Sequence, residues 1–433
     1  MILIKNGTVI DPDSNVEGEF DLLIDGAGIA DLGRPGSFAS ATVQRDIDAT
    51  GKWIVPGLID MHVHLREPGF EWKETIQSGS EAAILGGFTT ILCMPNTRPV
   101  NDNAEITRFI LEKAQGAKAA RVLPIGAVTV NLQGKQMAPL SELRKAGCAA
   151  FSDDGEPVYD SGIMRRALEW ASMLDVPICC HEEDKSLSCG GSMNESALSS
   201  RLGLKGMHKV AEEVMIARDI ELARTTGAAI HICHISSGRG VELVRRAKND
   251  GIKVTCEVTP HHLVLTEEAV RNFDTNAKMS PPLREVEESA ALLAGLKDGT
   301  IDCIASDHAP HESDSKDVEF AKASFGILGL QTSLPLILEF AAKGEISRRR
   351  AVEALSSAAA RILRIEGGNL RKGARADLAI IDPSWKWTFD RDCNRSLSLN
   401  SPFLGRQLCG IADAVLVNGR VVVEGRKLEQ SPK

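Results

Sequence analysis

Several features that mark other classes of protein are missing from this 433-residue chain. No run approaches the ~20 consecutive apolar residues needed to span a bilayer, and the N-terminus lacks the basic and apolar regions of a signal peptide. No block rich in Lys and Arg occurs, and 59 acidic against 50 basic residues give a net charge of −9. Because phosphate binding requires a basic face, we expect a cytoplasmic protein that binds neither nucleic acid nor a membrane.

The ten cysteines form no CxxC pair, which argues against a zinc ribbon or a thioredoxin-type redox site. Small buried thiols in a reducing compartment explain their placement better than a disulfide framework does. The seven that lie in or beside apolar, strand-like runs are Cys93, Cys148, Cys179, Cys180, Cys233, Cys256 and Cys303. No G-x-G-x-x-G follows a predicted strand at Gly86-Gly87, so a dinucleotide site is not expected there.

Both ends of the chain contain short apolar runs separated by polar turns. Asp11-Pro12, Asp25-Gly26 and Asn418-Gly419 are such turns, and the last is typical of a β-hairpin. We therefore predict that residues 1–56 and 364–433 together form one small β-sandwich domain. Residues 57–363 would then be a continuous insertion between its two halves.

The middle segment alternates apolar, strand-like runs with stretches of helical periodicity, such as residues 160–174 and 209–225. Eight strands, each followed by a helix, in ~300 residues predict an α/β fold, a (β/α)₈ TIM-type barrel. The eight runs are residues 57–65, 89–96, 121–129, 148–155, 176–184, 228–237, 252–263 and 300–311.

Metal-ligating side chains end several of these strands, and barrel enzymes carry their active sites at the C-terminal ends of the strands. Residues two apart in a strand face the same side, so His62 and His64 should both face the barrel mouth. Imidazole and carboxylate are ligands for zinc and similar ions, and buried carboxylates are costly unless paired or metal-bound. A metal centre is therefore predicted from the residues at strand ends: His62, His64, Asp153, Asp154, His181, His234 and Asp307.

Longer motifs resemble a known family. The histidine and aspartate pattern resembles the amidohydrolase superfamily of metal-dependent barrels. The segments that resemble type I dihydroorotases are DMHVHLREPG (60–69), MPNT (94–97), FSDDG (151–155), PPLR (281–284) and SDHAPH (306–311). The resemblance covers essentially the whole chain, and that family interconverts N-carbamoyl-L-aspartate and L-dihydroorotate in pyrimidine biosynthesis.

The resemblance implies a ligand set for one or two zinc ions per chain. It assigns His62 and His64 to the first zinc, and His181 and His234 to the second. Asp307 would bind the first zinc and act as the catalytic acid and base. Many relatives bridge two metals with a carboxylated lysine, whereas this chain has Asp-Asp-Gly there. The resemblance places the bridge at Asp154, with Asp153 as the alternative.

Arg66 follows His64 by two residues, so it should face the same mouth, where its guanidinium can grip a carboxylate with two hydrogen bonds. The resemblance implies that Arg66, Asn96 and His311 hold the α-carboxylate of the substrate. The other substrate contacts that it implies are His64, Leu65, Ser280, Phe325 and Gly326. Ser280 departs from the family pattern, in which asparagine is usual. Residues 311–325 are either a loop over the site or a solvated connection.

The remaining histidines are expected to have structural roles. His231 should lie on the opposite face from His234, and His308 should point away from the site. His261 and His262 are expected to form hydrogen bonds, since no ligand position remains for them.

Two alternatives stay open. The first is another cyclic amidohydrolase, a dihydropyrimidinase, hydantoinase or allantoinase. The dihydropyrimidinases and hydantoinases usually use a carboxylated lysine and a tyrosine, whereas the one tyrosine here is Tyr159. The second is a non-catalytic scaffold subunit, but such proteins typically lose metal ligands. The resemblance also implies a homodimer and gives aspartate transcarbamoylase as a candidate partner protein.

Overall fold

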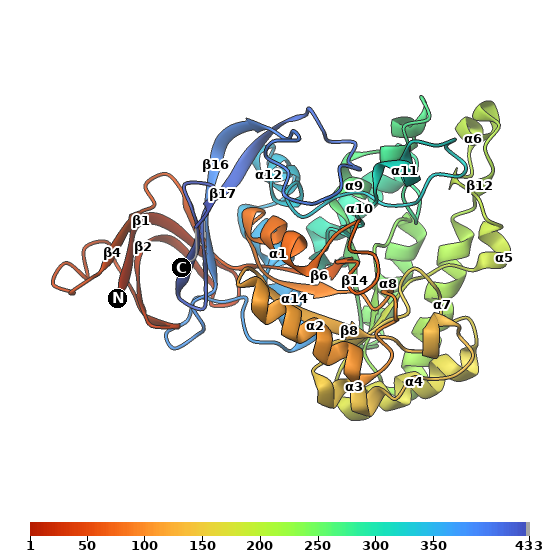
Figure 1. The fold of residues 1–433 in the computed structure, drawn as a ribbon, viewed down its shortest axis with the longest axis horizontal. Coiled ribbons are helices and arrows are strands. Elements are labelled where there is room, and N and C mark those ends of the chain that lie inside the picture. Colours follow the sequence, from red (N-terminus) through yellow and green to blue (C-terminus); the bar gives the residue numbers. More distant parts are fainter. Residues whose placement is uncertain (430–433) are drawn as a thin grey trace.

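The computed structural model describes residues 1–429, and the barrel with its flanking β-sheet is visible in Figure 1. Strands from the two chain ends, red and blue in the figure, lie together at one side of the barrel. The predicted fold class is confirmed. Within the described residues, no helix is both long enough and apolar enough to cross a membrane.

Eight parallel strands form the barrel, one inside each of the predicted runs or overlapping it. They are β6 (Leu58–Val63), β7 (Phe88–Cys93), β8 (Arg121–Gly126), β9 (Ala150–Phe151), β10 (Ile178–Cys180), β13 (Ile230–Ile232), β14 (Val254–Val258) and β15 (Cys303–Ile304). They are hydrogen-bonded in the order β15-β14-β13-β10-β9-β8-β7-β6. A parallel bridge between Val63 and His308 joins the last strand to the first.

Helices follow the strands along the chain and pack outside them, as Figure 1 shows. The predicted helices 160–174 and 209–225 correspond to α4 and α7. The α-helices are α1 (Ile76–Leu85), α2 (Ala104–Ala117), α3 (Leu140–Ala146), α4 (Ser161–Leu174), α5 (Lys185–Ser188), α6 (Ala197–Leu202), α7 (Val210–Thr226), α8 (Gly238–Asn249), α9 (Pro260–Val264), α10 (Val286–Asp298), α11 (Ser313–Lys316), α12 (Ser333–Ala342), α13 (Arg348–Leu355) and α14 (Ser357–Leu363). Short 3₁₀ turns lie at Val130–Leu132, Glu267–Val270 and Thr275–Ala277, and β11 (Met193–Asn194) pairs with β12 (Gly206–Met207).

Both faces of the barrel strands are buried, as expected for a parallel sheet covered by helices. One apolar cluster lies inside the barrel and includes Ile59, Met61 and Leu92. A larger cluster includes Leu58 and Val63 and lies between strands and helices. The seven cysteines assigned to apolar runs are all buried free thiols, which confirms that prediction.

Strands from the two chain ends build one nine-stranded, mainly antiparallel sheet. They are β1 (Ile2–Asp11), β2 (Val16–Asp25), β3 (Gly28–Gly33), β4 (Arg45–Asp48), β5 (Trp53–Pro56), β16 (Leu378–Thr388), β17 (Gln407–Val417), β18 (Arg420–Glu424) and β19 (Lys427–Leu428). The two ends meet where β5 pairs with β16, with Val55 opposite Ala379. The division into domains at residues 56/57 and 363/364 stays a prediction, and residues 430–433 of it lie outside the described residues.

The segment 389–406, between β16 and β17, reaches back onto the barrel. The Ser398 hydroxyl donates to the Lys73 carbonyl oxygen at 2.7 Å, and the Leu328 N–H donates to the Asn400 carbonyl oxygen at 3.0 Å. The C-terminal part of the chain therefore contributes to the surroundings of the barrel mouth.

Candidate active site

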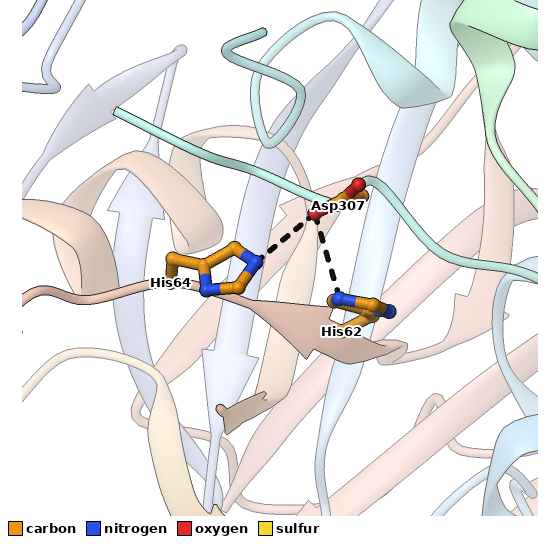
Figure 2. Close-up of side chains that lie close together, drawn as sticks. All are labelled: His62, His64 and Asp307. Atoms are coloured by element: carbon orange, nitrogen blue, oxygen red, sulfur yellow. Dashed lines mark hydrogen bonds and ion pairs between the residues drawn. The ribbon is translucent and has the colours of Figure 1, made fainter. Parts of the chain in front are cut away.

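The end of β6 brings two histidines to one aspartate. Asp307 Oδ1 lies 3.1 Å from His64 Nε2 and 3.5 Å from His62 Nε2, and Figure 2 shows both rings directed at this carboxylate. The pairing of β6 with β7 shifts register between Asp60 and Val63. A β-bulge changes the direction of the side chains at the end of a strand. Here Met61 packs in the barrel interior, and the next residue, His62, faces Asp307.

Three site residues have left-handed backbone conformations, which non-glycine residues rarely adopt. The φ angles are +62° at Arg66, +33° at His234 and +45° at Asp307. Such strain persists only where the surrounding structure imposes it. At Asp60, the carboxylate accepts hydrogen bonds from the N–H groups of His62 and Ser306 at 3.1 Å each. These bonds tie the end of β6 to the residue before Asp307.

Asp154 lies at the centre of the histidines. Its Oδ2 lies 3.4 Å from both His62 Nε2 and His64 Nε2. Its Oδ1 lies 3.4 Å from His181 Nδ1 and 3.3 Å from His234 Nε2. Its neighbour Asp153 points elsewhere. That carboxylate accepts from the N–H of Val128 at 2.8 Å, from the N–H of Thr129 at 2.9 Å and from the Thr129 hydroxyl.

Opposite charges dominate the electrostatics of this centre. Burial alone would lower the pKa of His62, but Asp154, Asp307 and Glu257 raise it well above its usual value. Burial opposes ionisation of Asp154 and Asp307, yet the neighbouring histidines hold the pKa of both carboxyls below the usual range. The carboxylates are therefore ionised, and they favour positive charge at this centre.

The donor set fits a divalent metal ion. His62, His64 and Asp307 place three ligand atoms within 4.8 Å of one another, and so do Asp154, His181 and His234. Two buried ring nitrogens, His62 Nε2 and His234 Nδ1, have no hydrogen-bond partner within residues 1–429. An unpaired buried nitrogen is costly, and a bound metal would satisfy His62 Nε2, which faces Asp154 and Asp307. The structure thus brings all six predicted ligands together.

The sequence analysis missed Glu257, which is completely buried on β14. Its Oε1 lies 2.7 Å from His62 Nδ1, and its Oε2 lies 3.1 Å from His231 Nε2. A carboxylate on one ring nitrogen of a histidine fixes the tautomer and directs the other nitrogen at the metal. The signal in the sequence was a lone Glu inside the apolar run VTCEV, since a buried carboxylate needs a partner.

His231 differs from the expectation of strand alternation. Its ring contacts the same carboxylate as His62. The two-residue period holds from Ile230 to Cys233 and breaks at His234, where the backbone is left-handed, so His231 and His234 both face the barrel interior. His308 does point away, with Nε2 lying 3.3 Å from Glu74. His262 hydrogen-bonds Thr259 and the Pro281 carbonyl oxygen, whereas His261 Nε2 has no partner among the described residues.

A cavity of about 420 Å³ opens onto the metal ligands. Ten of the predicted site residues line it: His64, Arg66, Asn96, Asp154, His181, His234, Ser280, Asp307, His311 and Phe325. The segment 311–325 borders the cavity at its two ends, through His311 and Phe325.

Two of the predicted substrate contacts do not line this cavity. Leu65 is buried in the apolar cluster outside the barrel. Both polar backbone groups of Gly326 are engaged: its N–H donates to the Lys278 carbonyl oxygen at 2.9 Å, and its oxygen accepts from Lys316 and Asn400.

Arg66 places a positively charged guanidinium in the wall of the cavity. Its Nε donates to the Pro310 carbonyl oxygen at 3.2 Å, and its terminal nitrogen lies 3.3 Å from His311 Nε2. Burial lowers the pKa of Arg66 to about 10, so it stays charged at neutral pH. Burial, together with Arg66 and Lys73, lowers the pKa of His311 to about 2, so that ring is neutral. Asn96 Oδ1 lies 2.9 Å from His64 Nδ1, and Asn96 therefore orients His64 as well as lining the cavity.

The sequence of this chain is similar to those of known proteins over nearly its whole length. The dihydro-orotase-like family model matches residues 51–239. A dihydroorotase from Pelobacter propionicus is 49% identical over 421 residues, which are 97% of this chain and 99% of that protein. The chain belongs to the dihydroorotase family. A second dihydroorotase, from Trichlorobacter lovleyi, is 47% identical over 98% of this chain and 100% of its own.

Solved structures place this dihydroorotase family member in a wider group. An L-hydantoinase (dihydropyrimidinase) from Arthrobacter aurescens superposes with a TM-score of 0.89 at 26% identity, covering 99% of this chain and 97% of that one. A dihydropyrimidinase from Brevibacillus agri gives 0.86 at 25% identity, covering 98% and 95%. The barrel and terminal sheet are thus shared between enzymes that are named for different substrates.

Another residue that the sequence analysis missed is Asn400, which lies in the segment between β16 and β17. Its Oδ1 accepts from the His311 N–H at 2.9 Å, and its Nδ2 donates to the carbonyl oxygens of Ala309 at 2.9 Å and Gly326 at 3.0 Å. In this dihydroorotase relative, Asn400 ties both ends of the loop at the cavity. No local pattern marks it, because its partners are remote in sequence.

The contact between Glu257 and His62 leads to a prediction about metal affinity. Glu257→Gln should weaken binding of the divalent ion about 10–100-fold, because the amide holds the ring less firmly and lowers its basicity. Competition with a chromophoric chelator measures the dissociation constant directly. Asp219→Asn, which alters an equally buried carboxylate paired with Arg218, is the control and should bind the ion as the parent does. Unchanged affinity in Glu257→Gln would remove Glu257 from the metal centre.

Proposed function

We propose that this protein is a dihydroorotase, which interconverts N-carbamoyl-L-aspartate and L-dihydroorotate in pyrimidine biosynthesis. The observation that carries the proposal is the shared cavity: six candidate metal-ligating side chains and a partly buried arginine line or adjoin one space. A cyclic amide with a carboxylate on its ring needs both parts. The relatives that match nearly the whole chain are named dihydroorotase.

The proposed cofactor is one or two Zn²⁺ ions, held by His62, His64, Asp154, His181, His234 and Asp307. Imidazole nitrogen with carboxylate oxygen is a usual zinc ligand set. Bound zinc supplies a Lewis acid for the reacting carbonyl and lowers the pKa of the attacking water.

The protein's own groups perform binding and proton transfer in this proposal. In hydrolysis, the ionised carboxylate of Asp307 accepts a proton from the attacking water and delivers it to the departing ring nitrogen. In cyclisation, Asp307 removes the proton from the carbamoyl nitrogen as that nitrogen attacks the side-chain carboxyl, and it delivers the proton to the carboxyl oxygen that departs as water. Arg66, Asn96 and His311 hold the α-carboxylate, so that the ring amide is presented to the metal ligands.

The structural likeness favours one competitor, a dihydropyrimidinase or hydantoinase. Two features of this chain disfavour it: the Asp-Asp-Gly segment has no lysine to bridge metals, and the single tyrosine, Tyr159, is 56% exposed. Allantoinase is the other cyclic amidohydrolase to test. A non-catalytic scaffold is disfavoured because all six candidate ligands lie together.

One experiment separates these functions. The purified protein is assayed with dihydroorotate, dihydrouracil, hydantoin and allantoin, and zinc is measured in the same sample before and after prolonged chelation. We expect hydrolysis of dihydroorotate, one or two zinc ions per chain, and loss of activity with the metal. Faster turnover of another substrate would assign that activity instead, and metal-free protein without any turnover would favour the scaffold.

The choice between the two aspartates can be tested separately. Asp154→Ala should reduce zinc content and activity together, because this carboxylate lies within 3.4 Å of four histidines. Asp153→Ala is the matched neighbour, and it should cost stability while leaving zinc content close to that of the parent. Its carboxylate holds the backbone at Val128 and Thr129 instead. The opposite ranking of the two zinc contents would make Asp153 the ligand.

Assembly and location carry over from the family alone. We propose a homodimer in the cytoplasm, and aspartate transcarbamoylase is a candidate partner protein. The ten cysteines, all free thiols, support a reducing compartment. The mass of the purified protein in solution, alone and mixed with aspartate transcarbamoylase, tests both associations.

A further inference from the structure

Two buried lysines lie behind the wall of the cavity. Lys278 is 2% exposed and Lys316 is 5% exposed, and within residues 1–429 neither has a carboxylate partner at ion-pair distance. Burial lowers the pKa of Lys278 to about 8, and burial together with the nearby charge of Lys278 lowers that of Lys316 to about 7. Burying an amine without a counter-ion is costly, so other contacts must compensate for it.

Those contacts all go to one short segment. Lys278 Nζ donates to the carbonyl oxygens of Phe320 at 2.8 Å and Ala321 at 3.0 Å. Lys316 Nζ donates to the carbonyl oxygens of Ser324 at 2.8 Å and Gly326 at 3.1 Å. Residues 320–326 form neither helix nor strand, so the two side chains take the place of a regular hydrogen-bond ladder.

The clamped segment is part of the cavity wall. Phe325 lines the cavity, and Lys278 Nζ lies 4.4 Å from the centre of its ring, within the range of a cation–π contact. Lys278 also directly precedes Met279 and Ser280, which line the same cavity as Phe325. The Gly326 N–H donates to the Lys278 carbonyl oxygen. Lys278 therefore connects two walls of the pocket through both its backbone and its side chain.

We infer that Lys278 and Lys316 are positioning residues, which hold Phe325 and Gly326 in place for substrate binding without touching the substrate themselves. The inference rests on the proposed dihydroorotase activity. The segment after α11 is then held by hydrogen bonds from the two lysine amines to its carbonyl oxygens, and by the bond from Asn400 to the Gly326 carbonyl oxygen. Neither lysine is a candidate metal ligand or proton carrier. Loss of either amine should therefore raise KM more than it lowers kcat.

The test uses the purified, metal-loaded protein and the variants Lys278→Met and Lys316→Met. Methionine has a similar length, carries no charge and is compatible with a buried site. Each variant loses two hydrogen bonds, so KM for dihydroorotate should rise about tenfold, with kcat and zinc content close to those of the parent. Lys322→Met is the matched control, because Lys322 lies in the same segment, is exposed and pairs only with Glu319. It should leave KM unchanged.

Hydrogen–deuterium exchange supplies a second readout that needs no substrate. Amides of residues 320–327 should exchange faster in both variants than in the parent or in Lys322→Met. The inference is overturned if KM and the exchange rates of the variants equal those of the parent. It is also overturned if the variants lose zinc, with a lower kcat and a higher KM as the result. If the parent protein fails to hydrolyse dihydroorotate, the proposed function fails, and the exchange comparison still decides whether the lysines hold this wall.

Discussion

Asp307→Asn is expected to lower kcat for dihydroorotate hydrolysis by about 10²–10⁴-fold, the usual contribution of a general acid–base group. Asparagine has nearly the same size but cannot take a proton. His62 and His64, against the effect of burial, hold the pKa of the Asp307 carboxyl below its usual value, so the base form is present at neutral pH. The kcat of the parent should therefore fall only at acidic pH, and this limb should disappear in the variant.

Because Asp307 is also a candidate ligand, activity must be expressed per bound zinc at saturating zinc concentration. Asp302→Asn is the control: Asp302 precedes the same strand and pairs with Lys248, so kcat should not change. An Asp307→Asn enzyme within a few-fold of the parent would exclude Asp307 as the proton carrier.

The second large effect concerns substrate choice. Dihydroorotate differs from dihydrouracil chiefly by a ring carboxylate, and a site built around the partly buried guanidinium of Arg66 disfavours a substrate that leaves it unpaired. The parent should prefer dihydroorotate by at least ~10³ in kcat/KM. Arg66→Met should abolish most of this preference by weakening dihydroorotate turnover, with zinc content unchanged.

The measurement is kcat/KM for both substrates on parent and variant. Arg271→Met removes an exposed arginine that pairs with Glu268, and it should keep the full preference. Equal turnover of the two substrates by the parent would mean that Arg66, Asn96 and His311 do not bind a carboxylate. The proposed activity would then be that of a hydantoinase and not that of a dihydroorotase.

Local sequence patterns were sufficient for the architecture and for most of the site. The alternation of apolar runs with helical periodicity gave all eight barrel strands, since burial on both faces leaves its mark in each strand separately. The candidate ligands were also recognisable, with Asp153 left as the alternative to Asp154, because each ends a strand and strand ends share one rim. The similar strand and turn pattern of the two chain ends predicted that they join, as they do where Val55 pairs with Ala379.

The tertiary structure decided what local periodicity cannot encode. Asp153 and Asp154 are neighbours of the same type, and only their partners separate them: backbone N–H groups for one and histidines for the other. The period of two holds at His231 and fails at His234, because the left-handed backbone there changes the face that the His234 side chain takes.

The partners of residues that contact the site from remote parts of the chain could not be predicted from the sequence. Glu257 meets His62 across 195 positions, and Asn400 meets His311 across 89. Motifs record residues that are close along the chain, whereas the groups that orient a site are chosen by packing between remote segments. The sequence therefore determined the barrel and its candidate ligands except for the choice between Asp153 and Asp154, whereas the tertiary structure decided that choice and which carboxylates and amides contact the candidate ligands.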